Sequence, residues 1–329
     1  MRTLTLLMAL MLGLLTVPGE ENSSLAKKNG YVINLDRAEK LEKMTYSSLF
    51  SKAGIIVLED TDESLLGKVD KLEVCDNNLY VLEKGRGLFL FNKQGKFIKM
   101  IGRQGKGPGE YIDPDDISID RENKKIYVLD SQTQNVLKYS GNGTFESSFK
   151  LENKGTRSTF IQPFKNALYT NLYTFDKSGK RFLLSKVDVT NGKRISFQFE
   201  ASQYNKGWNE LFSTNQHTFI SAPTGNPKFM QIFMDTIFEI TPKGIKPYIT
   251  LQSKKLVTKE YLETLIAEND MSKSTRVSKI CDRLMKTDKI YNVFDYWETA
   301  KYIHFGYHIG CYLSVSYTHL RAHETSAHL

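Results

Sequence analysis

Cysteine is scarce in this sequence of 329 residues, and its placement argues against two common uses. The three cysteines, Cys75, Cys281 and Cys311, are an odd number, and none belongs to a CxxC pair. Neither a disulfide framework nor a zinc knuckle is therefore indicated. We interpret the three side chains as small buried apolar groups.

Long apolar runs are also missing, with one exception near the start. Leu4–Val17 follows Arg2 and ends before Pro18-Gly19, and no cysteine follows it that a lipid could modify. This run is too short to cross a bilayer comfortably. A basic residue, a short apolar run and small residues after it are typical of a secretory signal peptide. We predict that residues 1–19 direct export to the periplasm or cell surface and that no transmembrane helix remains after their removal.

The sequence is also not acidic. Its 45 Lys+Arg outnumber 37 Asp+Glu and give a formal charge of +8. A basic balance raises the question of a nucleic-acid partner. The cations are dispersed along the chain, and export separates the protein from nucleic acid. We therefore expect no nucleic acid as partner and a solvated surface for most lysines.

Aromatic residues are abundant, and the strands that they favour recur at a fixed spacing. The 17 Tyr and 19 Phe suit half-buried sheet surfaces. Leu79–Glu83 (LYVLE) is answered by Ile126–Asp130 (IYVLD) at an offset of about 47 residues. Leu88–Phe91 and Gly95–Phe97 match Val136–Tyr139 and Gly143–Phe145 at an offset of about 48 residues. Units of 40–50 residues built from short strands are the signature of propeller blades.

The turn residues between these runs divide the chain into four predicted blades, each of four antiparallel strands. Their approximate bounds are 56–101, 113–152, 158–200 and 210–252. Helical spacing of apolar residues then predicts a two-helix insertion near 258–287. Strand-like alternation returns at 289–293 and 301–309, as expected for the start of a fifth blade. The predicted fold is all-β, a propeller with about four and a half blades present.

The loop Ile101–Tyr111 (IGRQGKGPGEY) has the glycines of a phosphate-binding loop but not their spacing. Pro108 follows Gly107 where a P-loop needs lysine, and Glu110 stands where a dinucleotide fingerprint needs glycine. A strand is predicted next, so no helix N-terminus is present to hold a phosphate. We predict a joint between two blades, with glycines supplying positive φ angles.

This loop and the strands after it resemble the NHL repeat. The matching pattern is Gly102-x-x-Gly105-x-Gly107-Pro108-Gly109-Glu110-Tyr111, then Pro114-x-x-Ile117-x-Ile119-Asp120 and Ile126–Asp130. Together with Leu58-Glu59-x-Thr61-Asp62-Glu63-Ser64-Leu65-Leu66-Gly67-Lys68, it is similar to exported six-bladed β-propeller proteins of Gram-negative gut bacteria. The resemblance is dense over residues 55–150 and implies six blades around a central channel. It implies no particular activity.

The end of the sequence has a different character. Val315–Thr325 (VSYTHLRAHET) resembles the conceptual translation of a sequencing adapter. We expect residues 314–329 to be non-native and residues 20–313 to form an incomplete propeller. The alternative is a His-rich metal-binding tail, through His319, His323 and His328.

Five charged residues near the glycine loop are the candidate ligand-binding set: Arg86, Arg103, Lys106, Asp115 and Asp116. The cations lie in predicted turns of the best-defined blade, where together they would receive an anionic group. Asp115 and Asp116 have a competing structural interpretation, in which they bond backbone N–H groups at the entry to a blade. Glu83 and Asp130 end equivalent strands, and their repetition favours a turn-holding role.

No catalytic residues, cofactor or metal site are predicted. Asp116, Asp120 and His217 are the only candidates for inward metal ligands on separate blades, and they do not recur in a pattern. His304 and His308 would lie on one face of a strand without an identifiable third ligand. The leading hypothesis is an exported binding module for a protein or glycan of the cell envelope. The alternative is a metal-dependent propeller enzyme of the lactonase or lyase type with a site in the channel.

Overall fold

A computed structural model describes residues 30–38, 54–153, 155–174, 179–208, 218–220, 225–267, 273–298, 302–310 and 312–319. The predicted signal peptide, residues 1–19, and His217 lie outside these ranges. Residues 314–319 of the predicted non-native tail belong to a strand, and residues 320–329 also lie outside.

Three consecutive four-stranded antiparallel sheets form the first part of the chain. The first sheet contains β2 (Lys71–Cys75), β3 (Asn78–Glu83), β4 (Gly87–Asn92) and β5 (Phe97–Ile101). The second contains β6 (Pro114–Asp120), β7 (Lys125–Asp130), β8 (Asn135–Ser140) and β9 (Phe145–Lys150). The third contains β11 (Ile161–Phe164), β12 (Ala167–Asn171), β14 (Phe182–Asp188) and β15 (Arg194–Glu200), beside a short ribbon of β10 (Thr156–Arg157) and β13 (Tyr173–Thr174).

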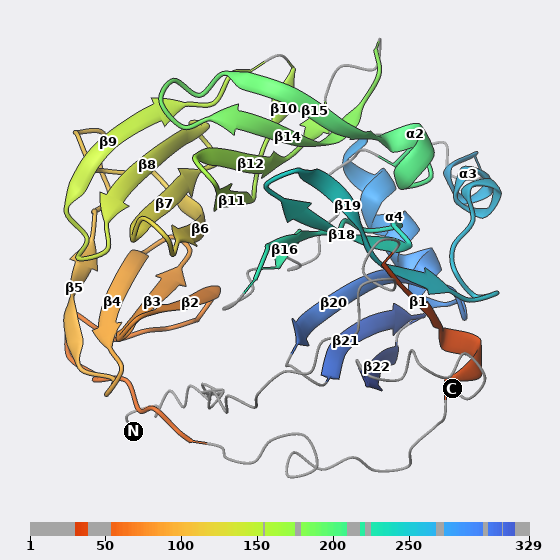
Figure 1. Ribbon diagram of the computed structural model, residues 1–329, viewed down its shortest axis with the longest axis horizontal. Coiled ribbons are helices and arrows are strands. Elements are labelled where there is room, and N and C mark those ends of the chain that lie inside the picture. Colours follow the sequence, from red (N-terminus) through yellow and green to blue (C-terminus); the bar gives the residue numbers. More distant parts are fainter. Residues whose placement is uncertain are drawn as a thin grey trace.

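The fourth sheet takes its outermost strand from the other end of the chain. It contains β16 (Phe219–Ile220), β17 (Lys228–Phe229), β18 (Thr236–Thr241) and β19 (Gly244–Gln252). The strand β1 (Tyr31–Asn34) pairs in parallel with β19, and the short helix η2 (Leu35–Arg37) follows it. A three-stranded sheet comes last, with β20 (Ile290–Glu298), β21 (Tyr302–Ile309) and β22 (Tyr312–His319). The first four sheets are arranged as the blades of a propeller around a common centre (Figure 1).

The predicted repeat is confirmed, because its matched segments occupy equivalent strands. Leu79–Glu83 and Ile126–Asp130 lie in β3 and β7, the second strands of their sheets. The second matched pair lies in β4 and β8, the third strands. Both sides of these strands are buried, because each sheet packs against a neighbouring blade. One apolar cluster joins the first two blades through residues such as Leu82, Ile117 and Tyr139.

The glycine loop is the predicted joint between the first two blades. Tyr111 accepts a hydrogen bond from the backbone N–H of Leu88 at 3.2 Å and donates to the Ile101 carbonyl at 3.0 Å. Tyr139 donates to the carbonyl of Gly109 at 3.0 Å. Burial raises the pKa of both phenols, which therefore stay protonated as donors. Gly102 has a φ of +69°, and a Cβ there would lie 2.6 Å from both Tyr111 and the Tyr139 hydroxyl.

Gly102→Ala is expected to lower the free energy of unfolding by about 2 kcal/mol, because the new methyl group adds a clash to an unfavourable φ. Gly85→Ala is the matched control. Gly85 also has a positive φ, +80°, but nothing lies within 4 Å of the point that a Cβ would occupy there. The control should therefore lose only about 1 kcal/mol. Equal losses for the two variants in urea denaturation would contradict a role for Gly102 in packing the joint.

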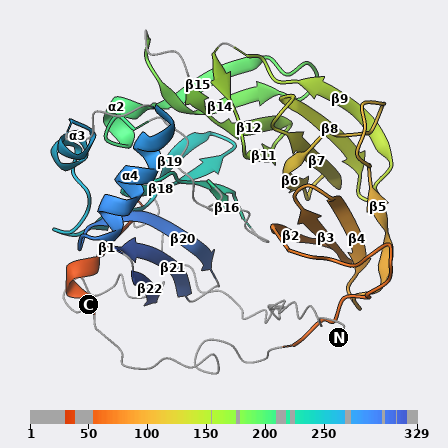
Figure 2. The same ribbon diagram turned by 180° about the vertical axis from the view of Figure 1, so that it is seen from behind.

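The predicted helices are present at the expected place. They are α3 (Lys259–Ala267) and α4 (Lys273–Met285), and a single turn, α2 (Ala201–Tyr204), occurs earlier in the chain. Leu262, Leu265, Ile280 and Leu284 are buried in one cluster with Trp208 and Tyr291. In both views α3 lies at the outside of the ring, and α4 lies between α3 and β20 (Figures 1 and 2). No helix among the described residues is long and apolar enough to cross a membrane.

Candidate ligand-binding face

One end of the first three blades carries the loops that contain the predicted site residues Arg86, Arg103 and Lys106. In each blade the first strand starts beside the end of the second, as Lys71 pairs with Leu82 and Pro114 with Asp130. The third strand starts and the fourth strand ends at this same end, as Leu88 pairs with Ile101. We call the loops 65–70, 84–86, 102–113, 131–134 and 155–160 the loop face.

Three equivalent side chains shape this face by holding the loop that enters each blade. The Glu83 carboxylate accepts from the Gly67 backbone N–H at 3.2 Å, and Asp130 accepts from that of Ile112 at 2.8 Å. The amide oxygen of Asn171, at the end of β12, accepts from the backbone N–H groups of Thr159 and Phe160 at 2.9 and 2.8 Å. The predicted turn-holding role of Glu83 and Asp130 is confirmed. Asn171 was missed, although it ends the strand that corresponds to β3 and β7.

Arg86 lies on the loop face and Asp115 lies beside it at the start of β6, but each already has protein partners. Arg86 pairs with Glu83 at 3.1 Å, bonds the Leu65 carbonyl and lies over the Phe89 ring. Asp115 accepts from the Ser131 hydroxyl and lies 3.6 Å from the Lys84 ammonium. Both therefore tie loops together, while Lys84 and Arg86 remain 41% exposed.

Arg103 and Lys106 are the most available of the predicted residues. The Arg103 Nε atom pairs with Glu110 Oε1 at 2.6 Å, yet the side chain is 81% exposed. Lys106 is exposed as well. Glu110 accepts from the Gly107 backbone N–H at 2.8 Å, and this bond and Arg103 hold the pKa of the carboxyl below its usual value. The Glu110 carboxylate thus occupies the Gly107 N–H, which a bound phosphate would need. This agrees with the prediction that the loop is a joint between blades and not a phosphate-binding loop.

Asp116, the fifth residue of the predicted ligand-binding set, does not reach the loop face. Its side chain is fully buried and bonds Lys71 Nζ of the first blade at 2.7 Å. Its other oxygen accepts from the backbone N–H of Ile161, in the third blade, at 2.8 Å. The predicted bond to a backbone N–H exists, but the donor belongs to the next blade rather than to the entry of its own. Asp116 is therefore a contact among three blades.

A second charged contact connects the innermost strands of the first two blades. Arg121 pairs with Glu73 at 3.0 Å, and Lys71 lies 3.9 Å from the same carboxylate. Glu73 is only 5% exposed and comes from β2, whereas Arg121 follows β6. Neither residue was predicted from the sequence, because the two lie a full repeat, 48 residues, apart.

The candidate metal ligands do not converge. Asp120 accepts from the backbone N–H groups of Glu122 and Asn123, both at 3.1 Å, and so holds a turn. His304 stacks on Trp297 and lies 3.2 Å from Asp295, while His308 contacts Asn292 at 3.4 Å. Among the residues that the structure describes, no group of three or more His, Cys, Asp or Glu side chains is placed to hold a metal ion.

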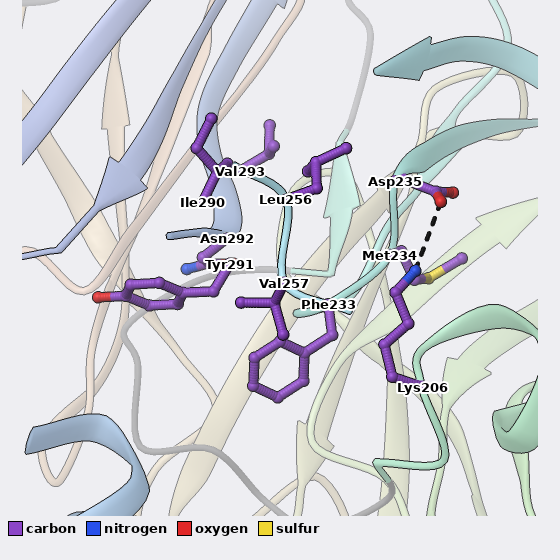
Figure 3. A pocket seen from close by; sticks show the side chains of 10 residues that line it. All are labelled: Lys206, Phe233, Met234, Asp235, Leu256, Val257, Ile290, Tyr291, Asn292 and Val293. Carbon is purple, nitrogen blue, oxygen red and sulfur yellow. Dashed lines mark hydrogen bonds and ion pairs between the residues drawn. The ribbon is translucent and has the colours of Figure 1, made fainter. Parts of the chain in front are cut away.

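A small pocket lies elsewhere, between the fourth blade and β20 (Figure 3). Lys206 and Asp235 form an ion pair of 3.4 Å at one end of the pocket, and Tyr291 and Asn292 lie at the other. Apolar side chains separate the two ends, among them Val257 and Phe233. Its polar groups therefore do not converge on one point, and the loop face remains the better candidate.

Comparison with known proteins supports the fold and leaves the activity open. A family model described as "Domain of unknown function (DUF4934)" matches residues 30–327. A Bacteroides fragilis protein of known structure, described as exported, is 18% identical and aligns with a TM-score of 0.69 over 89% of this chain and 77% of its own. No curated protein matches the chain.

Two further solved structures are more remote. A member of the duf4221 family from Bacteroides vulgatus is 9% identical, with a TM-score of 0.42 over 72% of this chain and 70% of its own. Virginiamycin B lyase from Staphylococcus aureus is 13% identical, with a TM-score of 0.39 over 80% and 69%. These similarities are too low to carry an argument about activity.

Proposed function

The chain belongs to the family described as a domain of unknown function, DUF4934, and from this premise we propose that it is an exported binding module. Its loop face would hold a protein or glycan of the cell envelope without chemical change. The proposal includes export by residues 1–19, an incomplete propeller of the six-bladed type formed by residues 20–313, and a non-native tail from residue 314.

The observation that supports binding is the lateral bonding of loops from three blades. The Gly85 backbone N–H donates to Asp113 at 3.2 Å across the first joint. Across the second, Arg157 donates to the Ser131 carbonyl at 2.5 Å and Gln134 to the Ser158 carbonyl at 2.9 Å. A rim that is ordered before the ligand arrives loses little conformational entropy on binding.

The charges on this rim indicate which ligand groups it suits. Lys68, Lys84, Arg103 and Lys106 all expose their side chains at this end of the blades. A guanidinium group binds a carboxylate or similar oxyanion through paired hydrogen bonds, and an ammonium group attracts the same anion as a point charge. We therefore expect an anionic group on the ligand, such as a uronic acid or an acidic side chain.

The test is binding of the purified exported protein to an array of acidic peptides and of neutral, uronic-acid and sulfated glycans, followed by calorimetry with the best probe. Arg103→Gln combined with Lys106→Gln should weaken binding at least about tenfold, because both charges are lost. Lys165→Gln is the control, since Lys165 is equally cationic but lies in the β11–β12 turn at the opposite end. Failure of every acidic glycan and acidic peptide to bind, equal weakening by the control, or turnover of a bound probe would each contradict the proposal.

On the residues that the structure describes, no observation favours the metal-dependent alternative. Asp116 and Asp120 are engaged in structural hydrogen bonds, and His217 lies outside the described residues. Metal analysis of the purified protein is the direct check on that alternative.

A further inference from the structure

The connection between the fourth blade and the three-stranded sheet contains the helices α3 and α4. It begins where β19 ends at Gln252 and ends where β20 starts at Ile290. The Ile290 backbone N–H donates to the Lys255 carbonyl at 2.8 Å, so the two ends of the connection lie together. The glycine loop joins β5 to β6 in the same way, from the fourth strand of one sheet to the first strand of the next. The helices therefore belong to the end of the propeller that carries the loop face.

The buried side of α4 rests on other connections of that same end. Ile280 and Leu284 are fully buried in a cluster with Trp208, Phe233 and Tyr291. Trp208 lies between β15 and β16, Phe233 lies between β17 and β18, and Tyr291 is at the start of β20. The equivalent connections of the first three blades form the loop face. The exposed side of α4 consequently faces solvent at this end of the molecule.

A row of cations occupies the exposed side of α4. Lys279 and Arg283 lie on the helix and Lys286 directly follows it, and all three side chains are exposed. Their spacing of four and three residues places them on one stripe, and Arg276 occupies the position one turn earlier. Asp282 is the only acidic residue of α4. Among the described residues, no carboxylate forms an ion pair with the three exposed cations, so they remain available to an anionic partner.

An acidic polysaccharide fits this stripe better than a lipid membrane does. A helix that binds a membrane surface needs an apolar face that enters the lipid, but the apolar side of α4 is buried against the protein. Of the described apolar side chains of α4, only Met285 is exposed. A chain of uronic acids carries one carboxylate on each sugar and can pair with several separate cations along a protein surface.

The position of α4 relative to the glycine loop indicates how long the ligand is. The joint between β5 and β6, which carries Arg103 and Lys106, lies across the ring from α4 (Figure 1). A short oligomer reaches only one of these two cationic areas, whereas a long chain can contact both at once. Contact at two places raises the affinity, because the second contact forms at a high effective concentration.

We propose that the ligand of the loop face is a long acidic polysaccharide whose chain extends across the ring to the cations of α4. This inference rests on the function proposed above. It adds the polymeric nature of the ligand and a second contact area, formed by Lys279, Arg283 and Lys286.

Calorimetry with a galacturonate trimer and with a galacturonate polymer tests the inference, with ligand concentrations expressed per sugar. The native protein should bind the polymer at least about tenfold more tightly than the trimer. Lys279→Gln, Arg283→Gln and Lys286→Gln in one protein should remove this gain, because the second contact is lost. Binding of the trimer at the loop face should remain unchanged in that variant.

The control variant loses the same number of positive charges at the opposite end of the blades. It combines Lys93→Gln, Lys165→Gln and Lys243→Gln, three exposed lysines in the turns β4–β5, β11–β12 and β18–β19. It should bind both probes like the native protein. All the substituted side chains are exposed, so neither variant is expected to unfold, and circular dichroism checks this.

Several results would overturn the inference and leave the function proposed for the loop face intact. They are a polymer that binds no more tightly than the trimer, an α4 variant that binds the polymer like the native protein, and a control that weakens polymer binding equally. Binding to phosphatidylglycerol vesicles without binding to the polymer would assign α4 to a membrane and would also overturn it. Failure of both galacturonate probes to bind would overturn it too, and the array of glycans and acidic peptides decides separately whether the proposed function fails with it.

Discussion

Asp116→Asn is expected to lower the free energy of unfolding by about 3 kcal/mol, because it breaks a fully buried charge pair. The carboxylate is enclosed between the Lys71 ammonium at 2.7 Å and the Ile161 backbone N–H at 2.8 Å. An amide has one acceptor oxygen for these two donors, so its NH2 group must face a donor. Lys71 is only 12% exposed and would face a neutral amide in place of the carboxylate. The loss should appear as a shift of the urea midpoint.

Asp115→Asn is the control for this substitution. Asp115 is the preceding residue in the same strand, but its side chain is 24% exposed and its cation, Lys84, is 41% exposed at 3.6 Å. Pairs of this kind contribute about 0 to 1 kcal/mol. A loss for Asp116→Asn no larger than that of the control would mean that the contact among three blades adds little to stability.

The contrast between these neighbours shows what the sequence predicts well. Strand positions in the first two blades follow from local patterns, since turn residues and alternating apolar residues repeat within about 50 positions. The roles of Glu83 and Asp130 follow from the same repetition. The burial of Asp116 does not, because its partners Lys71 and Ile161 lie 45 residues away on either side and nothing local identifies them.

The later part of the chain was less predictable for the same reason. β1 pairs with β19 across more than two hundred residues, and a four-residue apolar segment is too short to predict its partner. In the candidate site, Arg103 and Lys106 are exposed as expected, because glycine-rich joints lie at the surface. Arg86 and Asp115 are tied to neighbouring loops, a difference that depends on tertiary contacts and not on residue type.

The last blade and the three-stranded sheet are joined by a buried lysine. The Lys228 ammonium pairs with Glu298 Oε1 at 2.8 Å and lies 4.4 Å from the centre of the Tyr248 ring. Tyr248 and Tyr296 donate to Glu298 Oε2 at 2.8 and 2.7 Å. Burial, and then the charge of Glu298, raise the pKa of both phenols, so they remain donors. The cluster draws on β17, β19 and β20.

Lys228→Met is expected to lower the free energy of unfolding by about 3 kcal/mol at pH 7, because it leaves a largely buried carboxylate without its cation. Lys246→Met is the matched control. Lys246 also pairs with a glutamate, Glu239 at 3.0 Å, but it is 45% exposed. Its loss should stay below about 1 kcal/mol.

The loss of unfolding free energy caused by Lys228→Met should become smaller as the pH falls. Burial by itself raises the pKa of Glu298, but the Lys228 charge and the two phenol donors outweigh it and lower the pKa below its usual 4.5. A lowered carboxyl pKa stabilises the fold above that usual value, and this stability is lost as the pH falls through the folded-state pKa. The difference between native protein and variant should therefore be full at pH 7 and shrink below pH 4.5. A difference that stays constant in urea denaturation from neutral to acidic pH would show that Lys228 stabilises the interface through its packing and its ring contact instead of through Glu298.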